Sequence, residues 1–380
     1  YRNDSRGGAI KFTDVTTTIA PVLQDIGLVT DAAWTYPNGN GQPQLMLVGE
    51  WMSPTLLQLQ NGKYAPLFAK ADSLAGWWNS VVPHDVDGDG NIDYLLGNCG
   101  TNGYLQPAKD QPVKGYLKDF DNNGTPDAVF TAWLPASIRG ERKEYIVGSR
   151  DEFVREMNAF RQKFPNYRSF ASADFSAVFT PDELKGAVQV QAAEWRSGWL
   201  QNKGNNDFVF HPFSVPAQWS PVYGMVVCDA DGDNKADVLM HGNNFGMAPM
   251  LGRYDAGNGL LLKGDGKGTF SATPLQQSGF YVAGHAKALT QLVVAGKPAV
   301  LATQNNGPLK LFRCNNNNNT VPLQHTDRFA VIGYRDGRQE IRPLLFCTGY
   351  LSQSAPFMAT GPQVTSLHII DYKGQRRTIL

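Results

Sequence analysis

Three stretches of the chain place acidic side chains at alternate positions, the spacing with which one loop can surround a cation. The first, DVDGDGNID at residues 85–93, leads directly into the apolar run YLLG. Side chains two residues apart can converge when glycines allow left-handed backbone. Calcium takes about six to eight oxygen ligands at flexible geometry, so we expect the loop to hold Ca²⁺. Its predicted ligands are the carboxylates of Asp85, Asp87, Asp89 and Asp93 and the carbonyl of Asn91.

Two further stretches repeat the pattern in register, at 119–127 and 229–237. Their predicted ligands are Asp119, Asp121, Asn123, the carbonyl of Thr125 and Asp127, followed by Asp229, Asp231, Asp233, the carbonyl of Lys235 and Asp237. One such turn could equally be a solvated acidic hairpin. Three copies, each ending in an Asp before an apolar strand, favour about three structural calcium ions, because uncompensated carboxylates so close together would repel one another.

An EF-hand uses similar spacing, but it needs a bidentate Glu at loop position twelve and a helix on each side. Position twelve is occupied by Leu96, Phe130 and Met240, each inside an apolar run with β character. The EF-hand interpretation therefore fails for all three loops.

The loops belong to a longer repeat. A weaker copy at 36–51 has Tyr36, Asn38, Asn40 and Gln44 at the acid positions, so we expect no ion there, and 294–306 keeps only the strand after the turn. A strand, an Asn/Gly turn and an aromatic residue recur at 56–64, 199–208 and 260–270. Each repeat then contains four antiparallel strands, and spacings of about 40 to 60 residues are typical of propeller blades. The expected fold class is all-β, a β-propeller with about five recognisable four-stranded blades from a ring of about six to eight.

One region departs from the β pattern. Ser149 and Glu152 form a capping box before a helical stripe of phenylalanines, and Thr180 with Pro181 starts a second helix. We therefore predict blades over 1–325, with a helical insertion at 134–198 inside the blade that begins near Lys118. A C-terminal β segment at 326–380, ending in a hairpin, completes or caps the propeller.

The Asp loop followed by an apolar strand resembles the FG-GAP/VCBS repeat family, the calcium-loop β-propellers that include the head of integrin α chains. The stretches 29–52, 220–243 and 348–356 are similar to large FG-GAP-containing surface lipoproteins of Gram-negative bacteria. The resemblance implies that this chain is the C-terminal part of such a protein. It also implies a position on the extracellular face of the outer membrane, beside TonB-dependent nutrient importers. The family's calcium positions carry over onto the three Asp loops and not onto 36–44.

Composition excludes several other classes. The 34 Lys and Arg residues balance the 34 Asp and Glu residues, so the chain lacks the excess positive charge that is typical of nucleic-acid-binding proteins. No apolar stretch reaches the about 18 to 20 residues that are needed to span a bilayer. Cys99, Cys228, Cys314 and Cys347 form no C-x-x-C pair, which favours free thiols over a zinc site or disulfides. The nucleophile, zinc-protease and nucleotide-binding motifs are missing as well.

A ligand would bind at the face opposite the calcium loops, where the second strand of each blade ends. Aromatic rings beside amides suit a glycan or a peptide, although Trp packing between blades and Asn in turns would explain the same residues. The candidate ligand-binding residues are Trp51, Trp77, Trp78, Asn98, Trp133, Tyr223, Asn243, Asn244 and His285.

The leading hypothesis is a non-enzymatic, calcium-stabilised propeller that serves as a surface binding or assembly module, an accessory lipoprotein of an outer-membrane protein complex for nutrient uptake. One alternative is a carbohydrate-active enzyme, a lyase or hydrolase, for which Asp31, Glu50 and Glu194 are the free acids to inspect. The other is an integrin-like adhesion module, which rests on likeness of fold alone.

Overall fold

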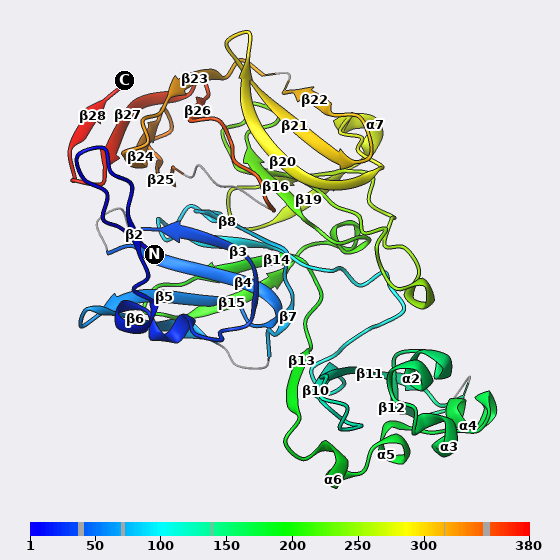
Figure 1. Ribbon diagram of the computed structural model, residues 1–380. Coiled ribbons are helices and arrows are strands. Elements are labelled where there is room, and N and C mark those ends of the chain that lie inside the picture. The colour runs from blue at the N-terminus through cyan, green and yellow to red at the C-terminus, as the bar shows by residue number, and fades with distance from the viewer. Residues whose placement is uncertain (37–41, 70–72, 138–139, 315, 345–349) are drawn as a thin grey trace.

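The computed structural model describes residues 1–36, 42–69, 73–137, 140–314, 316–344 and 350–380, and over these the chain is built from antiparallel sheets. The predicted all-β class is confirmed in that sense. Figure 1 shows the sheets stacked through the body and most of the helices gathered in one separate unit at the lower right. No helix in the described part of the chain is long and apolar enough to cross a membrane.

Four sheets lie side by side in chain order, and the last of them has three strands where the sequence predicts four. The first sheet contains β3 (Leu28–Thr35), β4 (Gln44–Met52), β5 (Thr55–Gln60) and β6 (Lys63–Ala69), with β7 (Gly76–Trp77) paired to β4, and the second contains β8 (Ser80–His84), β9 (Asp93–Gly97), β14 (Gly198–Asn202) and β15 (Phe208–Pro212). The third sheet contains β16 (Gly224–Cys228), β17 (Asp237–His241), β18 (Leu260–Gly264) and β19 (Phe270–Thr273). The fourth sheet contains β20 (His285–Val294), β21 (Lys297–Asn305) and β22 (Lys310–Arg313).

The first strands of these sheets lie side by side in chain order, β3 against β8, β8 against β16 and β16 against β20. Each neighbouring pair of sheets encloses its own apolar core. On β9, Tyr94 and Leu96 pack towards the first sheet, whereas Leu95 packs towards the third. Successive side chains on a strand point to opposite faces, so a strand buried on both faces needs a continuous apolar run. This is why the sequence after the first and the third Asp loop, where every residue of the strand is buried, is apolar without alternation.

A separate unit is inserted between β9 and β14. Its sheet has the order β12–β11–β10–β13, formed by β10 (Val113–Lys118), β11 (Asp127–Pro135), β12 (Arg142–Ile146) and β13 (Val188–Ala192). Between β12 and β13 lie α2 (Arg150–Glu156), α3 (Phe160–Lys163), α4 (Tyr167–Ala171), α5 (Phe175–Val178) and α6 (Pro181–Leu184).

The predicted helix starts are confirmed, since both capping boxes form at Ser149 and Thr180. The predicted phenylalanine stripe is buried in the core of this unit, where Phe153 and Phe160 lie with ring centroids 5.5 Å apart.

The extent of the insertion differs from the prediction. The sequence placed it at 134–198, but the strands of the second Asp loop belong to it as well, and the hairpin at 199–208 completes the sheet of the first Asp loop. Because β13 returns to pair with β10, the inserted sheet is not a simple meander and does not match the expected blade. Local sequence predicts that a strand pairs with its nearest neighbour in the chain. It does not indicate that β9 pairs with β14 across the inserted unit.

The C-terminal segment forms a sheet of β25 (Gln339–Pro343), β24 (Asp327–Tyr334), β27 (Val364–Asp371) and β28 (Arg376–Thr378), and β23 (Asn319–Pro322) pairs with β26 (Phe357–Thr360). The predicted terminal hairpin is β27 with β28. At the start of the chain β1 (Arg2–Asn3) pairs with β2 (Phe12–Thr13), followed by α1 (Thr16–Ile19), and α7 (Leu275–Ser278) follows β19. Cys99, Cys228 and Cys314 are free thiols, and Cys347 lies outside the described residues.

Candidate functional site

The three Asp loops have the same backbone. Positions four and six are left-handed in each, with φ between 58° and 88°. Only glycine and asparagine adopt this conformation at little cost, and these are the residue types present: Gly88 and Gly90, Asn122 and Gly124, Gly232 and Asn234. The Gly and Asn residues at these positions therefore specify the same backbone shape in each loop.

Each loop connects two paired strands, β8 to β9, β10 to β11 and β16 to β17. Leu96, Phe130 and Met240 lie inside the second of these strands. This confirms that the loops are not EF-hands.

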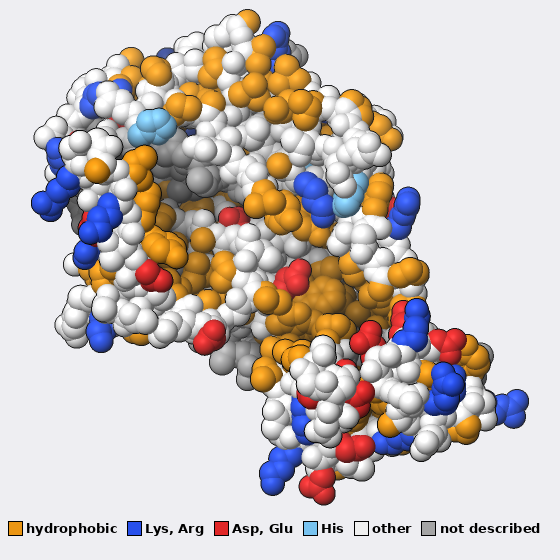
Figure 2. Space-filling view, in the orientation of Figure 1, with side chains coloured by type: hydrophobic (Ala, Val, Ile, Leu, Met, Phe, Trp, Pro, Cys, Tyr) orange, Lys and Arg blue, Asp and Glu red, His pale blue; other side chains and the backbone are white. Residues whose placement is uncertain are grey.

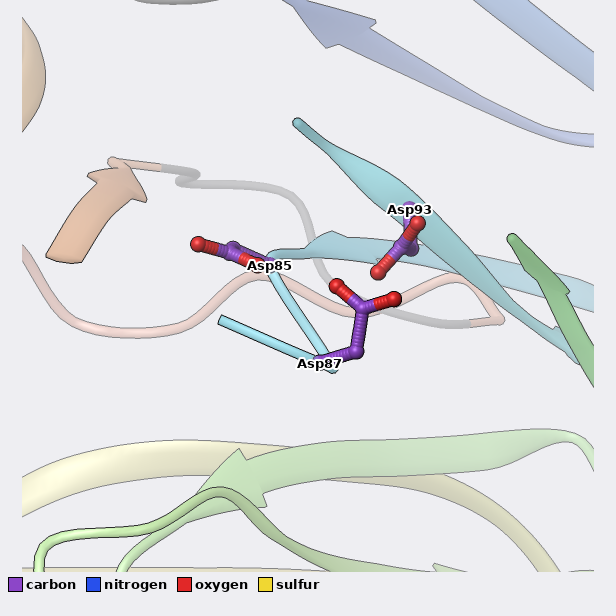
Figure 3. A group of neighbouring side chains, drawn as sticks. All are labelled: Asp85, Asp87 and Asp93. Carbon is purple, nitrogen blue, oxygen red and sulfur yellow. The ribbon is translucent and has the colours of Figure 1, made fainter. Parts of the chain in front are cut away.

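Carboxylates at positions one, three and nine converge in every loop. One oxygen of each residue lies within 4.8 Å of the others in the sets Asp85, Asp87 and Asp93; Asp119, Asp121 and Asp127; and Asp229, Asp231 and Asp237. Figure 3 shows Asp87 and Asp93 facing one another across the first loop, with Asp85 beside them. Three convergent carboxylates per loop are a donor set for a hard cation.

The Asp at position nine also fastens the loop to the sheet. Asp93 Oδ2 accepts the Val86 N–H at 2.9 Å and Asp237 Oδ2 accepts the Ala230 N–H at 2.9 Å. The second oxygen of each of these two carboxylates accepts a main-chain N–H group from the third strand of its sheet. For Asp237 the donor is the Gly264 N–H, at 3.0 Å. Asp127 accepts the Phe120 N–H at 2.8 Å.

The Asp at position one accepts main-chain N–H groups of its own loop. Asp85 accepts from Gly88 at 2.9 Å and from Gly90 at 3.1 Å. In the third loop Asp229 Oδ1 accepts from Gly232 at 2.7 Å, but its Oδ2 is buried without a hydrogen-bond partner among the described residues. Buried acceptors in native proteins are nearly always satisfied, so this oxygen fits the role of a cation ligand.

Position five departs from the predicted ligand set. Asp89 turns towards Asn91 and accepts both its main-chain N–H at 2.7 Å and its side-chain amide at 2.9 Å. Asp233 accepts the Lys235 N–H at 2.9 Å, and Asn123 accepts the Thr125 N–H at 2.8 Å. Ligation by the side chains at position five stays a prediction. Ligation by the carbonyls of residues 91, 125 and 235 stays a prediction.

The convergent carboxylates have raised pKa values. Burial, reinforced by the neighbouring acids, raises the pKa of Asp93 to about 8 and that of Asp85 to about 6. Burial likewise raises the pKa of Asp237 to about 6, and those of Asp127 and Asp229 also rise. A bound cation would reverse this cost, since it favours the charged form of each ligand.

The third loop already has a partial counter-charge. Lys263 on β18 forms an ion pair with Asp231. Burial raises the pKa of Asp231, but the hydrogen bond and charge of Lys263 and the hydrogen bond from the Asp233 N–H together outweigh burial, and the pKa falls below its ordinary value. Within the described residues no ion pair involves an Asp of the first or the second loop, so this partial counter-charge belongs to the third loop.

No protein-family model matches the sequence, and no curated protein matches it. Among solved structures, the chain is similar to the V. cholerae biofilm matrix protein Bap1 with 11% identity and a TM-score of 0.23. The match covers 92% of this chain and 47% of that one, so the chain spans about half the length of Bap1. A likeness with so low a TM-score identifies neither fold nor function.

At the weaker copy, Tyr36 and Gln44 flank a segment that contains Asn38 and Asn40, both outside the described residues. Gln44 is buried at the start of β4.

Three of the predicted ligand-binding residues are buried and serve the structure. Trp78, Asn98 and Asn243 have no exposed surface. Asn98 donates to the Glu194 carbonyl at 2.9 Å and accepts from the Cys99 N–H at 2.8 Å, and Asn243 donates to the Gly284 carbonyl at 2.8 Å. The structure thus corrects their assignment: each amide sits at the end of a second strand because it ties adjacent chain segments together.

Of the other predicted residues, Trp51 and Trp133 lie on the second strands β4 and β11, whereas His285 begins the first strand β20. Trp51, Trp77 and Trp133 are half-buried, as are Asn244 and His285, whereas Tyr223 is almost fully buried. Trp51 meets Trp77 edge-on with centroids 5.2 Å apart, and His285 stacks on Phe245 at 4.8 Å.

Of the three acids singled out from the sequence, two are committed to internal bonds. Asp31 accepts the Val81 N–H at 2.9 Å, and Glu194 pairs with Arg196. Glu50 makes no hydrogen bond or ion pair within the described part of the chain, and burial raises its pKa.

Sequence reasoning missed Lys287. Its Nζ lies 3.4 Å from the ring centroid of Tyr223 and 5.9 Å from that of Tyr350. The sequence predicts His285 as a ligand-binding residue, and the lysine is two residues further along the chain. Nothing in its sequence surroundings separates it from an ordinary surface lysine.

Proposed function

We propose that the chain is a non-enzymatic, calcium-stabilised β-propeller module that binds or assembles partners at a cell surface. One observation carries the proposal: three Asp loops share one backbone shape, and in each the carboxylates of positions one, three and nine converge. Two of these loops connect the first two strands of sheets whose first strands lie side by side, as propeller blades do.

The calcium ions have a structural role in this proposal. The donors are all oxygen, which suits Ca²⁺ better than Zn²⁺. The ion would neutralise carboxylates whose burial is costly, and through the position-nine Asp it would join the loop to the third strand. The carboxylates that converge on it also accept main-chain N–H groups of their own loops.

The proposed place of action is the outer membrane, as an accessory lipoprotein of a TonB-dependent nutrient importer. Support comes from the sequence resemblance to large surface lipoproteins with FG-GAP repeats. The test is purification of the tagged native protein from membranes in calcium-containing detergent buffer, followed by mass spectrometry of what accompanies it. An outer-membrane transporter in stoichiometric amount is the expected result, and an isolated soluble chain would contradict the proposal.

A carbohydrate-active enzyme is the second candidate, and one observation favours it. Glu50 and Lys287 are half-buried and make no ion pair in the described chain, and Lys287 lies over the ring of Tyr223. Burial lowers the pKa of Lys287 to about 8, which suits proton transfer near neutral pH. Turnover of a polysaccharide that is lost in Glu50→Gln would establish this function in place of the first.

A further inference from the structure

Lys287 on β20 is a half-buried cation without a counter-charge. Its ammonium group lies over Tyr223, whose ring meets that of Tyr350 edge-on at 5.1 Å. Within the described residues it makes no hydrogen bond and no ion pair. A partly desolvated charge is costly unless it is paired, and two aromatic faces compensate only in part. An anionic group from outside the chain would complete this site.

Trp51 on β4 adopts a strained backbone. Its φ is 62°, at a bulge of β4 where Glu50 pairs with Trp77 and Met52 pairs with Gly76. For a bulky side chain this conformation is an outlier, and such strain gathers at functional sites. The bulge places the indole edge-on to Trp77 and parallel to Phe130, with interplanar angle 9° and centroids 5.6 Å apart.

Buried donors without acceptors lie in the same aromatic cluster. Trp77 Nε1, Trp195 Nε1 and the Tyr254 hydroxyl have no hydrogen-bond partner among the described residues. The Trp77 and Trp195 rings are 4.6 Å apart. Several unsatisfied polar groups side by side need an explanation, and an oxygen-rich ligand or ordered water would provide their acceptors.

These groups form one continuous strip. Cys99 packs in one cluster with Trp51, Trp77, Trp195 and Tyr254. The Val222 N–H donates to the Asn98 carbonyl at 2.9 Å, and this bond brings the segment that contains Tyr223 alongside the segment that contains Cys99. The strip therefore runs from Trp51 through Cys99 to Tyr223 and Lys287. Figure 2 shows apolar side chains gathered where the inserted unit meets the body, the region to which this cluster belongs.

We propose that this Trp51–Lys287 strip binds a saccharide that carries a carboxylate, a uronic acid residue of a polysaccharide. Lys287 pairs with the carboxylate, the indoles cover the apolar face of the adjoining sugar, and Glu50 accepts from a hydroxyl. A neutral sugar would leave the cation unpaired, and an acidic peptide would not use the flat indole surface. The inference rests on the proposed binding function. It names the class of ligand that binds at the face opposite the Asp loops.

Calorimetric titration of the intact chain, in excess calcium, tests the proposal. The probes are oligogalacturonate, oligomannuronate and methyl-esterified oligogalacturonate, the last of which lacks only the charge. Lys287→Met keeps the stem and removes the ammonium group. Lys310→Met is the matched control, because Lys310 lies 4.7 Å from the centroid of Tyr281 at the edge of the fourth sheet.

The expected result is binding of at least one uronate, with affinity about 10- to 100-fold weaker for the esterified probe and for Lys287→Met, the range of one charge-assisted hydrogen bond. Lys310→Met should bind like the parent chain, and Trp77→Phe should weaken binding of every sugar. Which uronate binds identifies the source polysaccharide.

No binding of either uronate overturns the inference. So does equal binding of the esterified probe, or equal binding of polyglutamate. The calcium-dependent melting of the same samples separates this failure from failure of the proposed calcium-stabilised module. It also shows that each variant is folded.

Discussion

Asp93 accepts the main-chain N–H of Asn202 at 2.8 Å, across a separation of 109 residues. The two residues lie on either side of the inserted unit, so this bond closes the second sheet at the point where the chain leaves and returns. The same carboxylate converges with Asp85 and Asp87. Cation binding at the first loop is thereby coupled to the closure of the sheet.

Asp93→Asn should destabilise the protein by about 1–3 kcal/mol even without calcium, because the new amide NH₂ would face a main-chain N–H donor. It should also remove most of the stabilisation that calcium gives. Urea unfolding with and without calcium measures both effects. Asp255→Asn, at an exposed position, is the control, and equal free energies of unfolding for the two variants would contradict the account.

Calcium should change how stability depends on pH. The folded-state pKa of Asp93 is about 8 and those of Asp85 and Asp237 are about 6, all above their unfolded values. A raised pKa gives stability that is present at low pH and lost as pH rises through the folded value. Between pH 6.5 and 8 the chelated protein should lose up to about 1.4 kcal/mol per pH unit from Asp93.

The calcium-loaded protein should show no such loss over the same range. Buried His84 and His241, with pKa values lowered to about 4, act with the opposite sign and only below pH 6.5. Parallel pH profiles of the free energy of unfolding in calcium and in EDTA would be evidence against cation binding by these carboxylates.

Lys263 should compete with calcium at the third loop. Lys263→Met removes the ammonium group that pairs with Asp231, so the affinity of that loop for calcium should rise severalfold, as expected for an exposed, screened charge pair. Lys267→Met, at an exposed position in the same hairpin, is the control. Calcium titration by calorimetry that resolves no difference between the variants would refute the competition.

The inserted unit should be removable. Its two ends meet, since the Gly100 N–H donates to the Trp195 carbonyl at 2.8 Å. A short Gly-Ser linker in place of 104–191 should leave a chain that still melts cooperatively and binds one calcium ion fewer, because the second Asp loop is lost. Metal analysis after gel filtration measures the change, and an unfolded product or an unchanged calcium content would be the contrary outcome.

The sequence predicts the Asp loops well because everything that shapes them is local: acid spacing, left-handed Gly and Asn positions, and the apolar strand that follows. It predicts β8 with β9 and β16 with β17 for the same reason. The pairing of Gly198 with Leu96 across the inserted unit is not local, so the hairpin at 199–208 was assigned to the wrong sheet. Asn98 and Asn243 resemble ligand-binding amides in sequence, and only the packed structure shows that their partners are main-chain groups.

Calcium stoichiometry and thermal melting, measured together on one sample, test the central claim most directly. The protein should retain about three calcium ions after desalting, and excess EDTA should remove them and lower the Tm substantially. A chain that contains no calcium and melts at the same temperature in calcium and in EDTA would contradict the account.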